Sequence, residues 1–308
     1  MLLATSVCAC SSDAQNVAGS QNVAGSGAGG SAPAEAGASA GGGAVGFAGS
    51  LGDAGASGKN AGVGGALGQL DGWKLTWSDE FDGPVGGRLD NAKWRYSVGP
   101  SNVNNELEYY SDRPENSNYD GAGRYVITAR KEAFEGRNYT SAKFTTQATF
   151  QQKYGRFEAR LKLPAGQGLW PAFWALGGNN VGWPQCGEID IMETIGSELT
   201  TNRGSLHGPG YSGSNPLTAA YKLSAGPDFA QDFHVFATEW EENVVRFYVD
   251  GNLYETRTPA DAAGQQWVFD HSFYMILNVA VGGMLPGPPD DAVFPQSLSI
   301  DYVRVYSR

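Results

Sequence analysis

Residues 245–251 read Val-Arg-Phe-Tyr-Val-Asp-Gly, and this short segment shows the pattern from which we predict the fold class. Apolar side chains alternate with more polar ones over its first five residues, which is typical of a β-strand with one buried face. The stretch ends in Asp250-Gly251, a pair that favours the tight turn of a β-hairpin. It therefore predicts a strand that turns back into a second, antiparallel strand.

The same two-residue period recurs elsewhere in the chain. It is present in residues 157–162, 188–191 and 298–303, and Gly, Pro and Asn separate such segments. Helical periodicity is almost absent after Trp73. Many short strands with turn residues between them predict an all-β fold, a jelly-roll β-sandwich of two antiparallel sheets.

Composition divides the chain into a leading segment and a folded part. The chain has 308 residues and 44 glycines, many of which precede residue 72. Residues 11–71 consist mainly of Gly, Ala and Ser, and such side chains bury too little apolar surface to offset the entropy of ordering. We expect a disordered linker there. Residues 72–308 are long enough for one large β domain, the expected catalytic domain.

The first ten residues, Met-Leu-Leu-Ala-Thr-Ser-Val-Cys-Ala-Cys, resemble the end of a bacterial lipoprotein signal. This resemblance predicts an extracellular or cell-surface protein, tethered to a membrane through a lipid on Cys10. Cys186 is the one cysteine of residues 72–308, so no disulfide is expected within the domain.

The charge of the chain restricts the kind of partner. The formal net charge is −11 and the pI is near 4.7. Because nucleic acids and anionic membrane surfaces bind basic patches, we expect no nucleic-acid partner. A neutral polysaccharide fits this charge better than a strongly sulfated one. We also expect a monomer.

The candidate catalytic residues lie in residues 187–193, Gly-Glu-Ile-Asp-Ile-Met-Glu. In a strand, Glu188 and Asp190 share one face while the isoleucines point into the core. Strict alternation would turn Glu193 to the opposite face. A β-bulge at residues 191–192, where two apolar residues adjoin, would return Glu193 to the side of the other two carboxylates.

Three carboxylates on one face repel one another unless one keeps a proton, which raises its pKa. Glycoside hydrolysis uses this division, with one ionised carboxylate and one protonated one. On a straight strand the Cα atoms of Glu188 and Glu193 would be roughly 13–16 Å apart, whereas the two carboxyls of a retaining enzyme are about 5–5.5 Å apart. A solvated acidic face and a hard-cation site are the alternative interpretations.

Tryptophans gather just before these carboxylates. Residues 169–174 read Leu-Trp-Pro-Ala-Phe-Trp, and Trp183-Pro184 follows. Because proline interrupts a strand ladder, Trp170, Trp174 and Trp183 are expected on or beside loops. We expect at least one of them to stack on a sugar ring.

The chain resembles glycoside hydrolase family 16, and more narrowly its laminarinase-like members, which are endo-β-1,3-glucanases. The blocks that carry the resemblance occur in order at residues 77–81 (WSDEF), 104–110 (NNELEYY), 154–160 (YGRFEAR), 168–174 (GLWPAFW), 187–193 (GEIDIME), 207–208 (HG), 277–283 (LNVAVGG) and 301–306 (DYVRVY). The resemblance implies a jelly roll with a concave substrate cleft and a retaining double displacement. It makes Glu188 the nucleophile, Glu193 the acid/base and Asp190 the assisting residue.

The resemblance also implies a substrate-binding set and a metal site. Positions that line the cleft in family members match Asn105, Trp170, Trp174, His207 and Asn278. Catalysis would require no cofactor. A structural Ca²⁺ ion, bound on the face away from the cleft in many members, would match Glu80, Gly123 and Asp301, the first two through backbone oxygens.

Two positions depart from the pattern of laminarinase-like relatives. Residues 101–103 (Ser-Asn-Val) stand where relatives often carry Gly-Trp-Gly, and Lys143 stands where many have Arg. Lysine offers a point charge in place of a planar fork, so it would bind a sugar hydroxyl differently. We expect cleavage of internal β-1,3 linkages in laminarin-like β-glucans. The alternatives are mixed-linkage β-1,3-1,4-glucan or an algal galactan and, in another class, a non-catalytic β-glucan-binding module.

Overall fold

A computed structural model describes residues 69–224 and 226–308 of the chain. The predictions for residues 1–10 and for most of residues 11–71, including lipidation of Cys10, lie outside the described residues. No helix in the described ranges is both long enough and apolar enough to cross a membrane. These ranges contain nineteen strands and two 3₁₀ helices, η1 (Pro259–Ala262) and η2 (Asp291–Val293).

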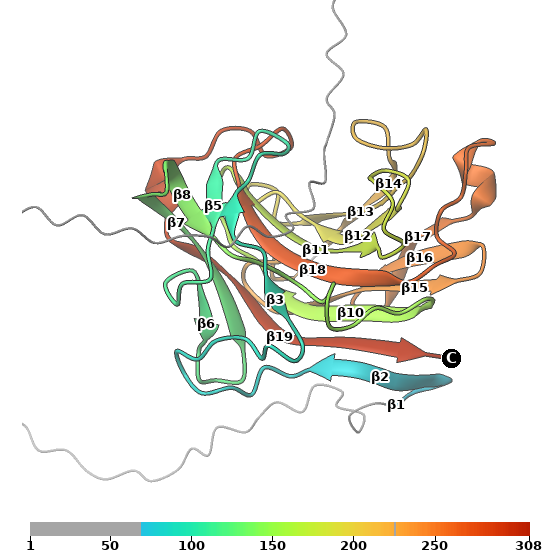
Figure 1. Cartoon of the computed structure of the whole chain (residues 1–308), viewed down its shortest axis with the longest axis horizontal. Coiled ribbons are helices and arrows are strands. Elements are labelled where there is room, and N and C mark those ends of the chain that lie inside the picture. Colours follow the sequence, from blue (N-terminus) through green and yellow to red (C-terminus); the bar gives the residue numbers. More distant parts are fainter. Residues whose placement is uncertain (1–68, 225) are drawn as a thin grey trace, which may run out of the picture. The chain divides into compact units, whose positions relative to one another are not determined.

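The strands form two sheets, as the sequence predicts (Figure 1). The larger sheet contains β1 (Gln69–Leu70), β2 (Trp73–Asp79), β4 (Gly99–Pro100), β5 (Glu108–Tyr110), β6 (Ser117–Tyr119), β7 (Tyr125–Phe134), β8 (Arg137–Ser141), β10 (Gly155–Lys162), β15 (His234–Glu241), β16 (Val244–Val249), β17 (Asn252–Arg257) and β19 (Gln296–Ser307). The smaller sheet contains β3 (Arg95–Tyr96), β9 (Lys143–Thr145), β11 (Leu169–Gly177), β12 (Glu188–Glu193), β13 (Thr201–His207), β14 (Leu217–Lys222) and β18 (Phe273–Val281).

The order of strands does not follow the chain. The smaller sheet runs β14-β13-β12-β11-β18-β9-β3, and the larger runs β17-β16-β15-β10-β19-β7-β8-β5-β4, with β2 beside β19. Neighbouring strands in the described residues are antiparallel, except that β5 and β8 are parallel. This one parallel pair departs from the expectation of purely antiparallel sheets.

The opening stretch forms the hairpin that its sequence predicts. Val249 at the end of β16 pairs with Asn252 at the start of β17. Asp250 and Gly251 between them have φ angles of 50° and 77°. Positive φ at both central residues matches the right-handed twist of the flanking strands, and Asp-Gly tolerates it.

The core lies between the two sheets and is rich in aromatic side chains. It joins Phe157 of β10 and Val303 of β19, in the larger sheet, to Ile189 of β12 and Leu277 of β18, in the smaller sheet. All nine residues of β18 are buried. The outer face of β11, β12 and β18 lies outside this core and carries polar groups beside a second, smaller apolar cluster, which includes Ile276 of β18.

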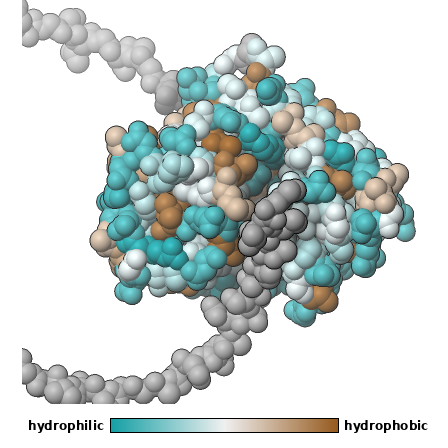
Figure 2. Space-filling view, turned by 90° about the horizontal axis from the view of Figure 1, so that it is seen from above, coloured by the Kyte–Doolittle hydropathy of each residue, from teal (hydrophilic) through white to brown (hydrophobic). Residues whose placement is uncertain are grey.

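This outer face is where the candidate carboxylates lie. Figure 1 shows β11, β12 and β18 curving over β10 and β15, with their concave side turned away from the larger sheet. Viewed from above, the surface is hollowed between two lobes and brown apolar surface borders the hollow (Figure 2). Strand β12 has β11 on one side and β13 on the other, so side chains from three strands can meet there.

Candidate active site

Strand β12 contains the predicted β-bulge. Opposite β11, Met192 pairs with Phe173 and Asp190 pairs with Trp174, so Ile191 is one residue in excess. The register toward β13 shifts at the same place. Ile191 and Met192 are both fully buried in the core. Two successive inward residues return Glu193 to the outer face, and the predicted bulge is confirmed.

Asp190 is the centre of a hydrogen-bonded group. It shares a hydrogen bond with Glu188, and its Oδ2 lies 3.1 Å from His207 Nε2, on the neighbouring strand β13. The Gly213 N–H donates to His207 Nδ1 at 3.2 Å, so the ring proton lies on Nε2. His207 Nε2 therefore donates to Asp190 and holds it beside Glu188.

Glu193 has a separate partner on β11. Trp170 Nε1 donates to Glu193 Oε1 at 3.0 Å, and the charge of Arg203 on β13 also favours the ionised form of Glu193. Trp170 thus orients Glu193 from β11, whereas the neighbours of Glu188 are Asp190 and His207.

Burial raises the pKa of all three carboxyls. The pKa of Glu188 is raised to about 8, by burial first and by the charge of Asp190 second. The same two causes raise the pKa of Glu193 to about 7, and burial raises that of Asp190 to about 7. The group therefore keeps protons near neutral pH, as acid catalysis requires. The higher pKa lies on Glu188, the residue that the motif makes the nucleophile, so the two roles rest on the order of the residues in the motif and not on these pKa values.

Comparison with known proteins identifies the family. The model of glycosyl hydrolases family 16 matches residues 102–304, which include all three carboxylates. The chain belongs to this family.

Relatives of this family 16 protein cover almost all of its described part. A β-glucanase of Rhodothermus marinus is 42% identical over an alignment of 249 residues, which covers 76% of this chain and 85% of the relative. The laminarinase catalytic domain of Thermotoga maritima MSB8 is 49% identical, with a TM-score of 0.72, and the match covers 77% of this chain and 98% of that one. The endo-β-1,3-glucanase of Pyrococcus furiosus is 45% identical, with a TM-score of 0.72 and coverage of 78% and 97%.

The tryptophans of the family 16 site do not all lie on loops as predicted. Trp170 and Trp174 lie within β11, whereas Trp183 lies in the turn before β12. The intervening Pro171 does not break β11, because its carbonyl accepts from the Thr194 N–H just past the end of β12. Its nitrogen faces the same side, beyond the end of β12, so the ladder between β11 and β18 is unaffected. The prediction was wrong for the two tryptophans of β11.

Trp183 and Asn105 occupy different parts of the site. Trp183 lowers the pKa of Glu188 and so favours its ionised form, and its ring centroid lies 6.1 Å from that of His207. Asn105 is exposed in the loop before β5 and has a φ of 59°. A Cβ added at Gly283 would lie 3.1 Å from the Trp170 ring and 3.3 Å from the backbone oxygen preceding Asn105. The loop of Asn105 therefore borders the Trp170 end of the site.

Asn278 joins a chain of hydrogen bonds that the sequence did not reveal. Trp174 Nε1 donates to Asn278 Oδ1 at 2.8 Å, and Asn278 Nδ2 donates to the hydroxyl of Tyr110 at 3.1 Å. The ammonium of Lys143 lies 5.0 Å from the Trp174 ring centroid, which is a cation–π distance. Tyr110 could not be found from its pattern, since buried tyrosines are common in β-sandwich cores.

Two of the three carboxylates and His207 also lie close enough together to bind a divalent cation. One ligand atom each of Glu188, Asp190 and His207 lies within 4.8 Å of the others. The nitrogen that would coordinate the ion carries the proton given to Asp190, so a cation would first displace that proton. The hydrogen bonds described above fit these residues better than coordination does.

The calcium prediction concerns Glu80, Gly123 and Asp301. Asp301 Oδ2 lies 2.8 Å from Nη1 of Arg160, and the Glu80 carboxylate makes two hydrogen bonds to Arg304. Because Arg160 already neutralises the Asp301 carboxylate, a cation would have to displace this arginine. Calcium binding stays a prediction: the melting temperature should then be higher in calcium chloride than in EDTA, and equal values would contradict it. A rise with calcium would show that the ion displaces Arg160.

Proposed function

We infer that the protein is a retaining endo-glycoside hydrolase that cleaves internal β-1,3 linkages of laminarin-like β-glucans. The observation that carries the mechanism is the placement of Glu188, Asp190 and Glu193 on the outer face of β12. Membership of family 16 and similarity to laminarinases support the substrate class.

The proposed reaction has two displacements at the anomeric carbon. In the first, ionised Glu188 attacks that carbon, the glycosidic C–O bond breaks, and Glu193 gives its proton to the leaving oxygen. The result is a glycosyl ester of Glu188. In the second, Glu193 takes a proton from water, the water oxygen attacks the same carbon, and the ester bond breaks. Glu188 is then ionised and Glu193 protonated, as at the start.

The partners of the carboxylates fit these roles. The Trp170 N–H stabilises the ionised form of Glu193, which the first step produces, and it also orients the carboxyl. The His207 N–H orients Asp190, and the hydrogen bond that Asp190 shares with Glu188 orients the nucleophile. Each group that moves a proton or forms a bond thus has a neighbour that fixes its position.

Reducing-sugar release from a panel of polysaccharides tests the proposal. We expect the full chain to act on laminarin more rapidly than on lichenan, agarose or carrageenan. Fastest release from lichenan would assign the enzyme to mixed-linkage glucan, and release from agarose or carrageenan alone would assign it to galactans. A folded protein that binds laminarin and releases no sugar from any of the four would be a binding module, and the proposal would fail.

We further propose that the enzyme is exported and acts at the cell surface. Its polymeric substrate and the lipoprotein-like residues 1–10 support this location. Expression in a bacterium with labelled fatty acid should label the protein, and Cys10→Ala should remove the label. An unlabelled protein in the cytoplasm would contradict the tether and the location.

A further inference from the structure

The bulge that presents Glu193 has a buried side-chain support on β13. The Glu193 N–H donates to Oδ1 of Asn202 at 3.2 Å, and the hydroxyl of Thr194 lies at 3.5 Å from the same oxygen. Asn202 is fully buried. Its oxygen therefore fixes the backbone at the point where the bulge ends.

The other end of the Asn202 amide is fixed from the larger sheet. Asn202 Nδ2 donates to the hydroxyl of Tyr254, on β17, at 3.2 Å. These bonds set the orientation of the amide, because its oxygen accepts and its nitrogen donates. The backbone of Glu193 is thus connected through one amide to a strand of the opposite sheet.

Tyr254 packs directly on the strand that faces the bulge. Ile191 and Met192 lie opposite Gly204, between the pairs that Asp190 and Glu193 make with β13. A Cβ added at Gly204 would lie 2.4 Å from the Tyr254 hydroxyl oxygen. No larger residue fits at Gly204 without moving Tyr254, so the bulge, β13 and β17 form one close-packed unit.

We propose that Asn202 is a positioning residue for Glu193 and that Tyr254 holds Asn202 in place. The inference rests on the proposed role of Glu193 as the acid. Protonation of a leaving oxygen depends on sub-ångström placement of the acid, and a displacement of about 1 Å can cost about a hundredfold in rate. Asn202 acts through the Glu193 backbone and touches no substrate.

The test compares two substrates that differ in their need for an acid. The values of kcat/KM are measured on a laminari-oligosaccharide, whose leaving sugar needs a proton, and on 2,4-dinitrophenyl β-laminaribioside, whose leaving group needs none. For Asn202→Ala we expect kcat/KM to fall about 10- to 100-fold on the oligosaccharide, and by less than about threefold on the aryl glycoside. Equal losses on both substrates would show a structural role alone and overturn the proposal.

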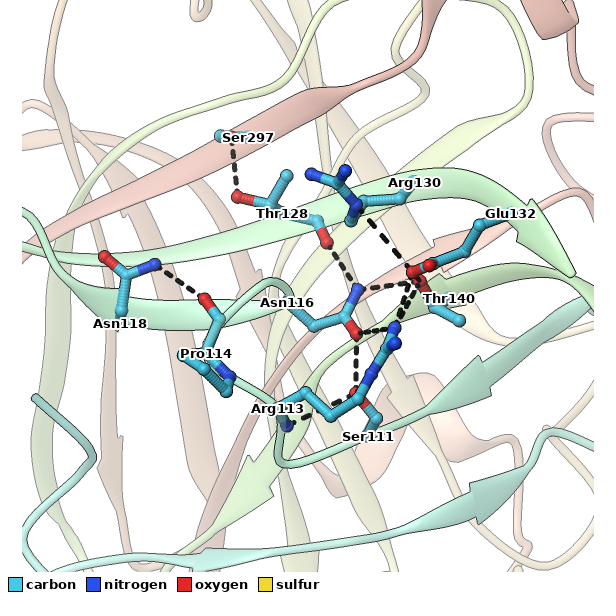
Figure 3. Close-up of polar contacts among 10 residues, drawn as sticks. All are labelled: Ser111, Arg113, Pro114, Asn116, Asn118, Thr128, Arg130, Glu132, Thr140 and Ser297. Atoms are coloured by element: carbon cyan, nitrogen blue, oxygen red, sulfur yellow. Dashed lines mark hydrogen bonds and ion pairs between the residues drawn. The ribbon is translucent and has the colours of Figure 1, made fainter. Parts of the chain in front are cut away.

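Asn116 provides a matched control. It is also fully buried, and its amide bonds Ser111, Arg113, Thr128 and Thr140, as Figure 3 shows. Its partners lie on β7, β8 and the turn after β5, none of them in the sheet of β12. We expect Asn116→Ala to lower the melting temperature and to leave the ratio of the two kcat/KM values unchanged.

Two further variants keep the outcome decisive. If Asn202→Ala does not fold, Tyr254→Phe is used instead, because it removes only the hydroxyl. The ratio of kcat/KM on the oligosaccharide to kcat/KM on the aryl glycoside should then fall by about two- to fivefold. An unchanged ratio overturns the proposal. Glu193→Ala tests the acid role of Glu193 separately from the positioning role of Asn202. A strong loss confined to the oligosaccharide supports the acid role, whereas equal losses remove that role and the Asn202 proposal with it.

Discussion

Replacing Glu188 with glutamine is expected to lower kcat on laminarin by about a thousandfold or more while the protein stays folded. Glutamine has nearly the shape of glutamate, but it offers no ionised oxygen to attack the anomeric carbon. The neighbours Asp190 and Trp183 remain in place to hold the amide. Reducing-sugar release and circular dichroism measure the two parts of this expectation.

An exposed glutamate supplies the control for this variant. Glu242 lies in the turn between β15 and β16, and its substitution by glutamine should leave kcat unchanged. A Glu188→Gln protein that keeps more than about a tenth of the wild-type rate would refute the nucleophile role. If Glu242→Gln lost as much activity as Glu188→Gln, the loss could not be assigned to the chemistry.

The same Glu188→Gln substitution is expected to stabilise the fold at alkaline pH. Burial and Asp190 raise the pKa of Glu188 from 4.5 to about 8, so the folded protein binds this proton more tightly than the unfolded chain. Between pH 4.5 and about pH 8, the free energy of unfolding of the wild type therefore falls as the pH rises. Below pH 4.5 both states hold the proton and the loss is absent. Glutamine has no charge at any of these pH values.

Urea unfolding at pH 4, 6 and 8 measures this effect. At pH 8 the free energy of unfolding of the variant should exceed that of the wild type by a few kcal/mol, on the order of the energy of the rise in pKa from 4.5 to about 8. The difference should shrink toward zero near pH 4. A gain that did not change with pH would contradict the assignment to a buried charge. If Glu188→Gln is more stable than the wild type at pH 8 and is also inactive, the catalytic carboxylate lowers the stability of the fold.

The catalytic strand was predictable because its irregularity is visible in the residues themselves. Glu188 and Asp190 alternate with isoleucines, and the adjacent Ile191 and Met192 break that period by one residue. A bulge is the local solution that keeps both apolar residues in the core and Glu193 outside it. The hairpin at Asp250 was predictable because the turn-forming pair Asp250-Gly251 ends an alternating segment.

Residues 106–110, Glu-Leu-Glu-Tyr-Tyr, show where local pattern is insufficient. Their alternation is plain, but the acids Glu106 and Glu108 are buried whereas Leu107 is 38% exposed. The reason lies far along the chain, because Glu108 Oε2 accepts from the Val281 N–H at 2.7 Å. A two-residue period fixes which side chains share a face, and tertiary partners decide which face is buried.

The functional partners of the carboxylates were hidden for a related reason. The tautomer of His207 is set by the Gly213 N–H, and the backbone of Glu193 is held by Asn202. Both contacts join neighbouring strands or loops whose register the sequence does not show. Pro171 is a similar case: whether proline interrupts a strand depends on whether its nitrogen faces a ladder bond, which only the strand order reveals.

The central position of β19 in the larger sheet delays strand pairing while the chain is being synthesised. This strand pairs with β2, β7 and β10. Asp79 therefore cannot pair until Val303, its partner more than two hundred residues later in the chain, has been synthesised. At ribosomal rates of about 5–20 residues per second, that delay is roughly 10–45 s. During this time β2 and β10 are nascent strands with an unfilled edge between them, open to pairing with other chains. Chaperones that shield nascent chains would therefore matter more for this protein than for a fold built from sequential hairpins.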